Sequence, residues 1–350
     1  MKTALSYRSE ETKGGIGFIK EKPAQYIKLL DAKIDKYIEH LKNIEVKCSR
    51  PRVNREHLLA EVTVLNDTIL EACAQFERQV QDPEAIKAAQ AYFREKTNPI
   101  LSKSYFINRC RTWPRGQQGD FETLELAYKN TPFSEGIGYY LDKYLISTDL
   151  GIGVRERIEK LRDLLKGELK SRSAPKVLDV ACGSCREVFE LTPEIKSSKA
   201  RYTCVDIDPE ALNFARDRFS HAGLLSDQVE LLTYNALRMF DYETAITEFG
   251  KQDIIYSVGY FDYLPDDFLE KMLKTLYMML KPGGKLITSF KDANRYRPQI
   301  YHWLVDWDGF LQRTEVDFDR LFRRAEVPDN ALSMTRLESG NIIFYTATKK

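Results

Sequence analysis

Apolar residues recur every three or four positions through the first third of the chain. One series with this spacing covers residues 24–44, a second covers 58–80, and a third begins after residue 82. The spacing is that of amphipathic helices, each burying one face. We therefore expect residues 1–150 to form a helical N-terminal domain. Such stripes indicate a core or a face for a partner helix, so we assign them no chemistry.

The pattern changes to short apolar runs after residue 170. Helix-like segments separate most of these runs, which cover residues 177–180, 201–206, 228–234, 253–258 and 285–289, followed by a final pair at 332–338 and 341–348. Apolar runs alternating with helices are typical of a parallel sheet buried on both faces. We therefore expect residues 151–350 to form an α/β domain that closes with an antiparallel strand pair.

Residues 105–146 differ in kind from both parts. They mix aromatic residues, arginines and glycines with few stretches of regular spacing. This composition predicts an irregular loop whose conformation is set by what it contacts. Two interpretations remain open: the segment is a lid that contacts a ligand, or it is a tight connection that packs the two domains together.

A turn without bulky side chains follows the first expected strand. Asp179 lies in that strand, and the turn is Ala181-Cys-Gly-Ser184. Backbone amides in such a turn can approach a ligand closely. The second strand ends at Asp206, whose carboxylate is placed to accept hydrogen bonds from ribose hydroxyls. The third strand ends at Asn235, which could offer its side-chain carbonyl oxygen to a ligand.

The pattern Asp-x-Ala-x-Gly-x-Cys at residues 179–185 resembles the acidic-x-Gly-x-Gly-x-Gly loop of class I S-adenosylmethionine-dependent methyltransferases. The order of strands, the Leu-Lys-Pro-Gly-Gly turn and the closing antiparallel pair fit the same family. A nicotinamide-binding Rossmann domain predicts neither of the last two features. The resemblance implies a Rossmann-like, seven-stranded methyltransferase domain with S-adenosylmethionine as its cofactor. The cofactor-binding residues expected are Asp179, Ala181, Cys182, Gly183, Asp206, Ile207, Asn235, Ala236 and Ser257.

A narrower resemblance covers roughly residues 100–350. The runs Pro-Arg-Gly-Gln-Gln-Gly-Asp-Phe, Gly-Ile-Gly-Tyr-Tyr-Leu, Ala-Cys-Gly-Ser-Cys-Arg-Glu and Tyr-Ser-Val-Gly-Tyr-Phe-Asp-Tyr-Leu-Pro-Asp carry it. They are similar to bacterial methyltransferases assigned to the synthesis of an extracellular-factor 3-hydroxypalmitic acid methyl ester. This resemblance implies methyl transfer to a small molecule, with a carboxylic acid as one substrate class.

Catalytic candidates follow the fourth strand, whose carboxyl end faces the methyl group in this fold. Asp262 could orient or deprotonate a substrate, and Tyr263 could donate a hydrogen bond to it. Further residues near the expected sheet edge or in the 105–146 segment are candidates for substrate binding: Asp120, Phe121, Tyr140, Phe261, Arg295, Arg297, His302 and Trp303.

The charges near the site leave the substrate open. Arg295 and Arg297 favour a carboxylic acid and methyl ester formation, because arginine binds carboxylates in a bidentate manner. Asp120, Asp262 and Asp306 favour a cationic amine or guanidine and N-methylation. A hypothesis of another class is a non-catalytic regulatory protein that binds S-adenosylmethionine, since alanine and cysteine replace two loop glycines.

The overall charge excludes some partners. The chain has 53 basic and 52 acidic residues, a formal net charge of +1, so no global field favours nucleic acid or an anionic membrane. No apolar run reaches the ~20 residues of a membrane span. We expect a cytoplasmic protein with a small-molecule substrate, and the N-terminal helices could serve a homodimer.

Cys182 and Cys185 form a Cys-x-x-Cys pair that raises a redox or zinc hypothesis. Zinc would need two further ligands, but there is no second pair and the four histidines are scattered. We therefore expect no metal, and reduced cysteines that serve as small residues in a tight turn.

Overall fold

A seven-stranded sheet forms the centre of the computed structural model, which describes residues 22–50, 54–224 and 227–350. Its strands are β1 (Lys176–Val180), β2 (Arg201–Asp206), β3 (Val229–Thr233), β4 (Gln252–Val258), β5 (Leu280–Lys291), β6 (Leu332–Arg336) and β7 (Ile342–Thr348). Their order is β3-β2-β1-β4-β5-β7-β6, and only β7 runs antiparallel to its neighbours. The predicted Rossmann-like α/β class is confirmed, including the closing antiparallel pair.

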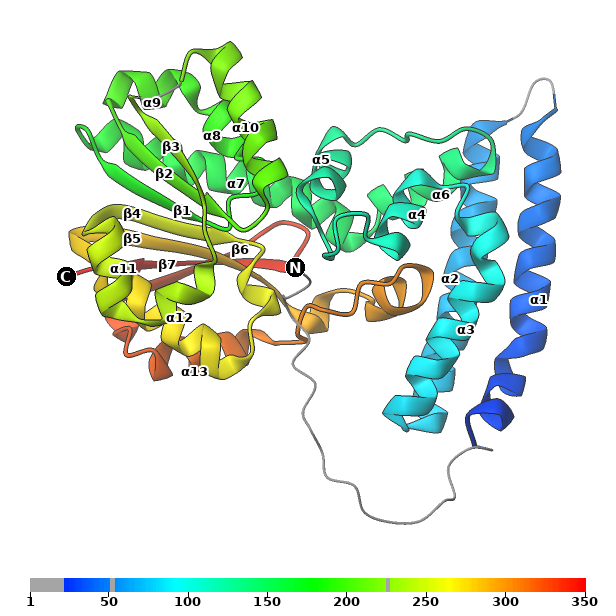
Figure 1. Ribbon diagram of the computed structural model, residues 1–350. Helices are drawn as coiled ribbons and strands as arrows, with labels where there is room; N and C mark the ends of the chain where they lie inside the picture. The colour runs from blue at the N-terminus through cyan, green and yellow to red at the C-terminus, as the bar shows by residue number, and fades with distance from the viewer. Residues whose placement is uncertain (1–21, 51–53, 225–226) are drawn as a thin grey trace.

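Helices cover both faces of the sheet (Figure 1). One face carries α7 (Asp149–Ser171), α8 (Arg186–Glu190), α9 (Thr192–Ser198) and α10 (Pro209–Ala222), and the other carries α11 (Tyr242–Phe249), α12 (Asp266–Met278) and α13 (Glu315–Arg324). On the second face, Phe318 and Phe322 of α13 pack on Phe290 of β5. β1 and β4 lie between the two layers, so side chains on both their faces are buried.

Three long helices form a separate layer beside the sheet domain, at the right of Figure 1. They are α1 (Lys22–Cys48), α2 (Arg55–Val80) and α3 (Pro83–Leu101). The Asn54 side chain accepts a hydrogen bond from the backbone N–H of His57 and so begins α2. Asp82 caps α3 in the same way, with Pro83 at its first position. The three helices predicted from the apolar spacing are confirmed.

Trp303 joins the two parts of the molecule. It lies in a short π-helical segment, Ile300–Leu304, and its ring packs edge-on against both Phe76 of α2 and Phe93 of α3. Its indole N–H donates to Glu77 at 2.7 Å, and its side chain is fully buried. The prediction that Trp303 contacts the substrate is therefore wrong: an aromatic residue after β5 could line a pocket or fill a core, and here it anchors the sheet domain to the helical layer.

Residues 105–146 are helical, which corrects the irregular loop expected from their composition. The segment contains α4 (Tyr105–Thr112), α5 (Phe121–Lys129) and α6 (Ile137–Ile146). Ser104 and Asp120 begin the first two helices by accepting hydrogen bonds from backbone N–H groups. Asp142 accepts hydrogen bonds from the backbone N–H groups of Phe133 and Ser134, which fixes the connection between α5 and α6. Helices of eight to ten residues span too few turns for their apolar spacing to stand out.

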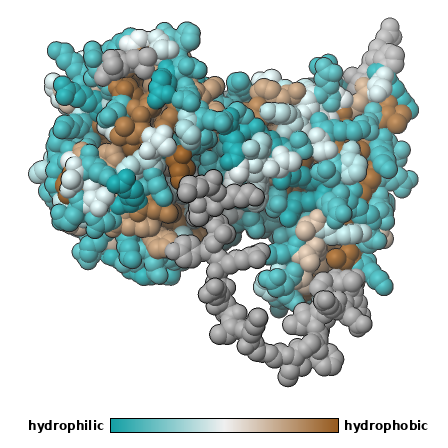
Figure 2. Space-filling view, viewed as in Figure 1, coloured by the Kyte–Doolittle hydropathy of each residue, from teal (hydrophilic) through white to brown (hydrophobic). Residues whose placement is uncertain are grey.

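The visible surface is mixed in character. Figure 2 shows hydrophilic side chains interspersed with small apolar patches over both the sheet domain and the helical layer. Among the described residues, no helix combines the length and the apolar character that crossing a bilayer requires.

Candidate functional site

The turn between β1 and α8 has an unusual backbone. Ala181, Gly183 and Cys185 all have positive φ angles, of 59°, 55° and 48°. The N–H of Cys182 donates to the carbonyl of Val205 in β2, and the N–H of Cys185 donates to the carbonyl of Cys182. A Cβ atom at Gly183 would meet only Phe121, at 3.8 Å. The turn thus presents an open backbone surface at the carboxyl end of β1, where open α/β sheets bind ligands.

Asp206 lies at the end of β2, directly beside this turn. Its Oδ2 accepts a hydrogen bond from the N–H of Gly183 at 2.7 Å, and its Oδ1 accepts one from the N–H of Asp208 at 2.9 Å. Burial raises the pKa of Asp206 above its usual value. Each carboxylate oxygen retains a further lone pair for a ligand. The neighbouring Ile207 is 47% exposed and offers an apolar face beside the carboxylate.

Asn235 and Ala236 follow β3 on the same edge of the sheet. The side-chain carbonyl of Asn235 accepts a hydrogen bond from the N–H of Leu237 and caps a short 3-10 helix at Ala236–Phe240. The oxygen predicted to contact a ligand thus already accepts one hydrogen bond, and its second lone pair could accept another.

Ser257 does not face this site. Its side chain is fully enclosed within the sheet, and its hydroxyl donates to the carbonyl of Val180 at 2.8 Å. Its hydroxyl is therefore engaged inside the sheet, and the predicted part of Ser257 in cofactor binding stays a prediction. Both faces of β4 are buried, so alternation along that strand did not show which side chains reach the edge.

Asp179 is a buried carboxyl group with an unpartnered oxygen. Only 2% of the residue is exposed, and its Oδ2 has no hydrogen-bond partner. Burial and the neighbouring Glu187 raise the pKa of Asp179 well above its usual value. Burial also raises the pKa of Glu187 to about 7, while Tyr256 donates a hydrogen bond to that carboxyl group. An unpartnered buried oxygen beside a ligand-binding turn fits a cationic group of a ligand.

Helix α5 lies directly on the turn. The Glu125 carboxylate accepts hydrogen bonds from Ser184 Oγ, Arg186 Nη1 and Arg218 Nη2, at 2.7–2.9 Å. Burial opposes ionisation of Glu125, but Arg218 and Ser184 outweigh it and lower its pKa. Sequence reasoning missed this cluster, because its members come from three separate helices and a turn.

The cavity between α5 and the turn is small. It has a volume of about 60 Å³ and is lined by Phe121 and Tyr128 of α5, by Asp179, and by the turn from Ala181 to Ser184. Ligand pockets usually enclose ~300–1,000 Å³. The position of α5 therefore restricts the space available at the turn.

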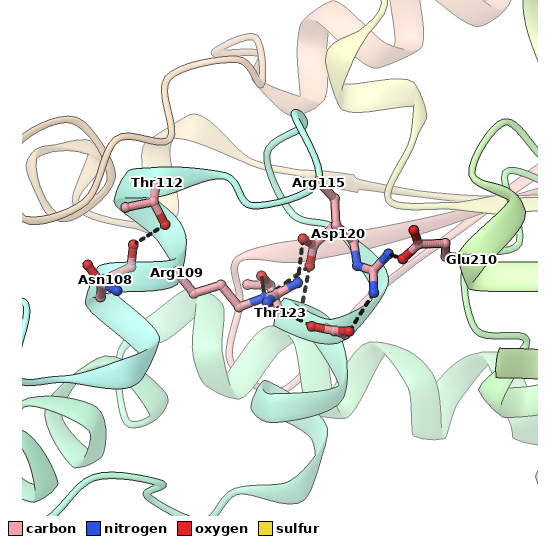
Figure 3. A network of polar contacts seen from close by, with 8 residues as sticks. Asn108, Arg109, Thr112, Arg115, Asp120, Thr123 and Glu210 are labelled. Carbon is pink, nitrogen blue, oxygen red and sulfur yellow. Dashed lines mark hydrogen bonds and ion pairs between the residues drawn. The ribbon is translucent and has the colours of Figure 1, made fainter.

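A second polar network fixes the start of α5 (Figure 3). Arg109 of α4 forms a buried ion pair with Asp120, at 2.7 Å between Nη2 and Oδ2. Arg115 forms an ion pair with Glu210 at the start of α10, so the network reaches the sheet domain. Asp120 also caps α5 through the N–H of Thr123. Helix capping and the ion pair with Arg109 occupy its carboxylate, and its predicted role in substrate binding stays a prediction.

Asp262 follows β4, as predicted, but it is paired. Its Oδ2 accepts a hydrogen bond from Lys291 Nζ at 2.5 Å, and its Oδ1 accepts one from the backbone N–H of Lys291. Only 2% of Asp262 is exposed, and burial lowers the pKa of Lys291. The Tyr263 hydroxyl accepts a hydrogen bond from the Trp307 indole at 2.7 Å. Asp262 is therefore not positioned as a free general base.

Arg157 of α7 was not identified from the sequence. It is 3% exposed, and its guanidinium packs on the backbone of Gly259, where a Cβ atom would come within 2.8 Å of Nη1. Its Nε has no hydrogen-bond partner, and among the described residues no carboxylate forms an ion pair with it. Its charge contributes to the lowered pKa of Lys291, so two cations lie close together at the end of β4. A lone arginine in an amphipathic helix carries no signal that would distinguish it from a surface residue.

Residues 177–284 match the family described as the methyltransferase domain. This part of the chain is similar to that family, which supports the predicted methyltransferase. A sterol 4-C-methyltransferase from Caenorhabditis elegans is 25% identical to the chain over 39% of its length, and a tRNA N(3)-methylcytidine methyltransferase from Schizosaccharomyces pombe is 26% identical over 41%. The chain covers 37% and 43% of these two relatives, respectively.

A solved structure supports the fold beyond the methyltransferase domain. A possible exported protein from Bordetella parapertussis aligns with 76% of this chain and 87% of its own, with a TM-score of 0.56 and 20% sequence identity. The match to the methyltransferase domain supports the predicted cofactor, S-adenosylmethionine.

The remaining candidates for substrate binding do not gather at the methyltransferase site. Phe261 is fully buried in the core beside Phe290, so its predicted contact with substrate is wrong. Arg297 forms an ion pair with Asp67 of α2. Three others lie apart from the cavity at the turn: Tyr140 on α6, His302 in the segment that packs on α3, and Arg295 beside a separate cavity near the start of α13.

Proposed function

We propose that the protein transfers a methyl group from S-adenosylmethionine to the carboxylate of a small-molecule acid, forming a methyl ester. The observation that carries this proposal is the buried guanidinium of Arg157 at the carboxyl end of β4, with which no carboxylate of the described residues forms an ion pair. A buried cation without a counterion is costly, and a carboxylate bound in a bidentate manner would compensate it.

The cofactor fits the groups around the turn. Asp206 would accept hydrogen bonds from the ribose hydroxyls, and Ile207 with Asn235-Ala236 would meet the adenine. The unpartnered oxygen of Asp179 would accept a hydrogen bond from the ammonium group of the methionine part. The open backbone at Gly183 allows a ligand to approach. These assignments rest on the donors and acceptors present at the carboxyl ends of β1, β2 and β3.

The proposed chemistry needs little from the protein beyond positioning. The cofactor supplies an electrophilic methyl group on a sulfonium. A substrate carboxylate is ionised at neutral pH, so no base must remove a proton. One carboxylate oxygen forms the new bond to carbon while the electron pair of the broken bond goes to sulfur. Arg157 would hold the carboxylate and fix its direction of approach, which agrees with Asp262 being occupied by Lys291.

Methylation of an amine or guanidine is less well supported. The three acids suggested for a cationic substrate each have a cationic partner: Asp120 with Arg109, Asp262 with Lys291, and Asp306 with Arg94. A cationic substrate would therefore compete with an existing ion pair. A regulatory protein that binds the cofactor without catalysis would not need an unpaired arginine at the reactive edge.

We also propose that α5 acts as a lid. The contacts of Glu125 hold it on the turn, and the cavity beneath it is small, so binding and release of the cofactor would require α5 to move. A homodimer through the N-terminal helices stays a prediction. It would use the exposed apolar side chains of Leu29, Val46 and Val64. The cytoplasmic location likewise stays a prediction.

The experiment that tests the substrate class uses S-adenosylmethionine labelled with tritium in its methyl group. The protein is incubated with a panel of fatty, hydroxy and aromatic carboxylic acids, and in parallel with amines and guanidines. Alkaline hydrolysis of a methyl ester releases labelled methanol, which is volatile, whereas an N-methyl group remains in the product. We expect the labelled product to form only with the carboxylic acids, and we expect alkali to release its label as methanol. Product that resists alkali would contradict the proposal.

A pair of variants tests the role of Arg157. Arg157→Gln should raise the KM for the acid about 10- to 100-fold, the effect of losing a charge-assisted hydrogen bond, and leave the cofactor affinity unchanged. The control Arg297→Gln removes a partly exposed arginine paired with Asp67 and should change neither value. If Arg157→Gln weakens cofactor binding alone, then Arg157 holds the carboxylate of the cofactor and the assignment to the substrate fails.

A further inference from the structure

Two cysteines of the cofactor turn lie close together. The thiols of Cys182 and Cys185 and a carboxylate oxygen of Asp179 all lie within 4.8 Å of one another. Cys185 is buried, whereas Cys182 is partly exposed and lines the cavity under α5. The proposed function uses only the backbone of this turn, so the two thiols have no role in it.

The backbone allows these two cysteines to be joined. The hydrogen bond from the N–H of Cys185 to the carbonyl of Cys182, at 3.0 Å, closes a four-residue turn. The ends of such a turn have Cα atoms less than ~7 Å apart. Disulfides join cysteines whose Cα atoms are ~4.4–6.8 Å apart. A bond between Cys182 and Cys185 therefore requires little backbone movement.

Cys185 occupies a backbone conformation that disfavours a side chain. Its φ angle of 48° is in the left-handed region, which glycine adopts more readily than an L-residue. Ala181 in the same turn shares this conformation, with a φ angle of 59°.

We propose that Cys182 and Cys185 form a reversible disulfide when the protein meets hydrogen peroxide, and that this bond lowers the affinity of the turn for S-adenosylmethionine. The formation of the disulfide is independent of the proposed function, and its effect on the cofactor rests on it.

The thiol pair has the properties that this reaction needs. Burial alone would raise the pKa of Cys185, but hydrogen bonds from Cys182 and Cys204 outweigh it and lower that pKa to about 6. At neutral pH the pair therefore carries a thiolate at Cys185, because burial and the hydrogen bond to Cys185 raise the pKa of Cys182 well above its usual value. The Cys182 side chain lines the cavity under α5. A peroxide molecule is small enough to enter there.

The reaction balances in two steps. The Cys185 thiolate attacks one peroxide oxygen, the O–O bond breaks, and the leaving hydroxide takes up a proton to become water. The resulting sulfenic acid is attacked by the sulfur of Cys182. The S–O bond breaks, and the second hydroxide takes the proton of that thiol and leaves as water. Two thiols have lost two electrons to one peroxide, and a thiol reductant reverses the change.

The disulfide would constrain the two residues between the sulfurs. The N–H of Gly183 holds Asp206, and the hydroxyl of Ser184 holds Glu125 of α5. A new covalent ring at this point shifts the backbone that the cofactor must approach and the group that fixes the ribose-binding carboxylate. We therefore expect the affinity for S-adenosylmethionine to fall at least tenfold on oxidation.

Zinc binding is the competing explanation for the cluster. Structural zinc takes four ligands in tetrahedral geometry. Three donor groups meet here among the described residues, and one of them, Asp179, has a pKa raised well above its usual value and so favours the neutral form. The cluster therefore fits a thiol pair better than a zinc site.

Peptide mass mapping tests the disulfide directly. Trypsin cleaves after Lys176 and Arg186 and releases one peptide, residues 177–186, that contains both cysteines and no others. After treatment of the full chain with hydrogen peroxide, we expect this peptide to lose two hydrogens and resist alkylation. Dithiothreitol should restore both thiols. The variant Cys182→Ser should show no such loss, whereas Cys48→Ser, which alters a cysteine of α1, should behave as the wild type.

Titration calorimetry with S-adenosylmethionine tests the second half on the same samples. We expect oxidised wild type to bind at least tenfold more weakly than reduced wild type, and dithiothreitol to restore the affinity. The proposal is overturned if the peptide is fully alkylated after peroxide, if the disulfide leaves the affinity unchanged, or if the purified protein carries one equivalent of zinc that protects the thiols. Failure of the reduced protein to bind the cofactor would instead refute the proposed function, and the peptide masses would still decide the disulfide.

Discussion

Replacing Arg157 by methionine is expected to leave the free energy of unfolding nearly unchanged, whereas the same change at Arg109 should lower it strongly. The two arginines are almost equally buried, with 3% and 7% of their surfaces exposed. They differ in their partners. Arg109 is paired with the buried carboxylate of Asp120, and Arg157 has no carboxylate partner among the described residues.

The expected magnitudes follow from these environments. Arg109→Met leaves Asp120 buried and unpaired, and breaking a buried ion pair costs about 3–5 kcal/mol. Arg157→Met removes a cation whose burial is itself unfavourable by several kcal/mol. It also removes the hydrogen bond between Arg157 and Tyr128, worth about 1 kcal/mol. These two effects oppose each other, so the variant should be within about 1 kcal/mol of wild type or more stable.

Urea unfolding of the full chain at pH 7, followed by tryptophan fluorescence, measures this difference. The gap between the two variants should reach about 3 kcal/mol or more, with Arg109→Met the weaker. If Arg157→Met loses as much stability as Arg109→Met, then Arg157 already has an anionic partner within the chain. The reasoning that Arg157 awaits the carboxylate of a ligand would then be refuted.

Three further predictions concern the cofactor turn and its surroundings. Asp206→Ala should weaken S-adenosylmethionine binding about 100-fold in titration calorimetry, because two hydrogen bonds to a charged group are lost. The control is Asp208→Ala, which alters only the cap of α10. An equal loss of affinity in both variants would contradict the ribose assignment. Burial raises the pKa of Glu187 from 4.5 to about 7, so the folded state binds a proton more tightly and stability should fall as pH rises from about 4.5 to about 7. Glu187→Gln should remove up to about 3 kcal/mol of that fall in urea unfolding at several pH values, and an unchanged slope would count against the shifted pKa. Glu125→Gln should weaken the attachment of α5 to Arg218 and speed cofactor association in stopped-flow fluorescence; an unchanged rate would argue against the lid.

Local features of the site could be predicted because each belongs to one continuous segment. The turn after β1 and the carboxylate at the end of β2 depend on residues that are adjacent in the chain, and the structure brings Gly183 and Asp206 into direct contact. The helices at residues 105–146 were missed for a different reason. They are short, and they depend on side-chain caps such as Ser104 and on the distant carboxylate of Asp142.

The direction of side chains near β4 could not be predicted. A strand with one polar face shows by alternation which side chains point to solvent, but both faces of β4 are covered. The sequence therefore did not show that the side chain of Ser257 is enclosed. Charged residues raised a similar problem: Asp262 was placed correctly at the end of β4, and its partner Lys291 comes from the end of another strand.

The order of helices and strands, the α/β class and the position of the cofactor turn could be predicted from the sequence, because periodicity and turn chemistry act over a few neighbouring residues. The pairing of charges depends instead on how distant elements pack. Arg109, Lys291 and Arg94 occupy the acids that a cationic substrate would need, and Arg157 packs on Gly259 without a carboxylate partner in the part of the chain that the structure describes. Ion pairing depends on separations of a few ångströms between elements far apart in the chain, and no local pattern records those distances.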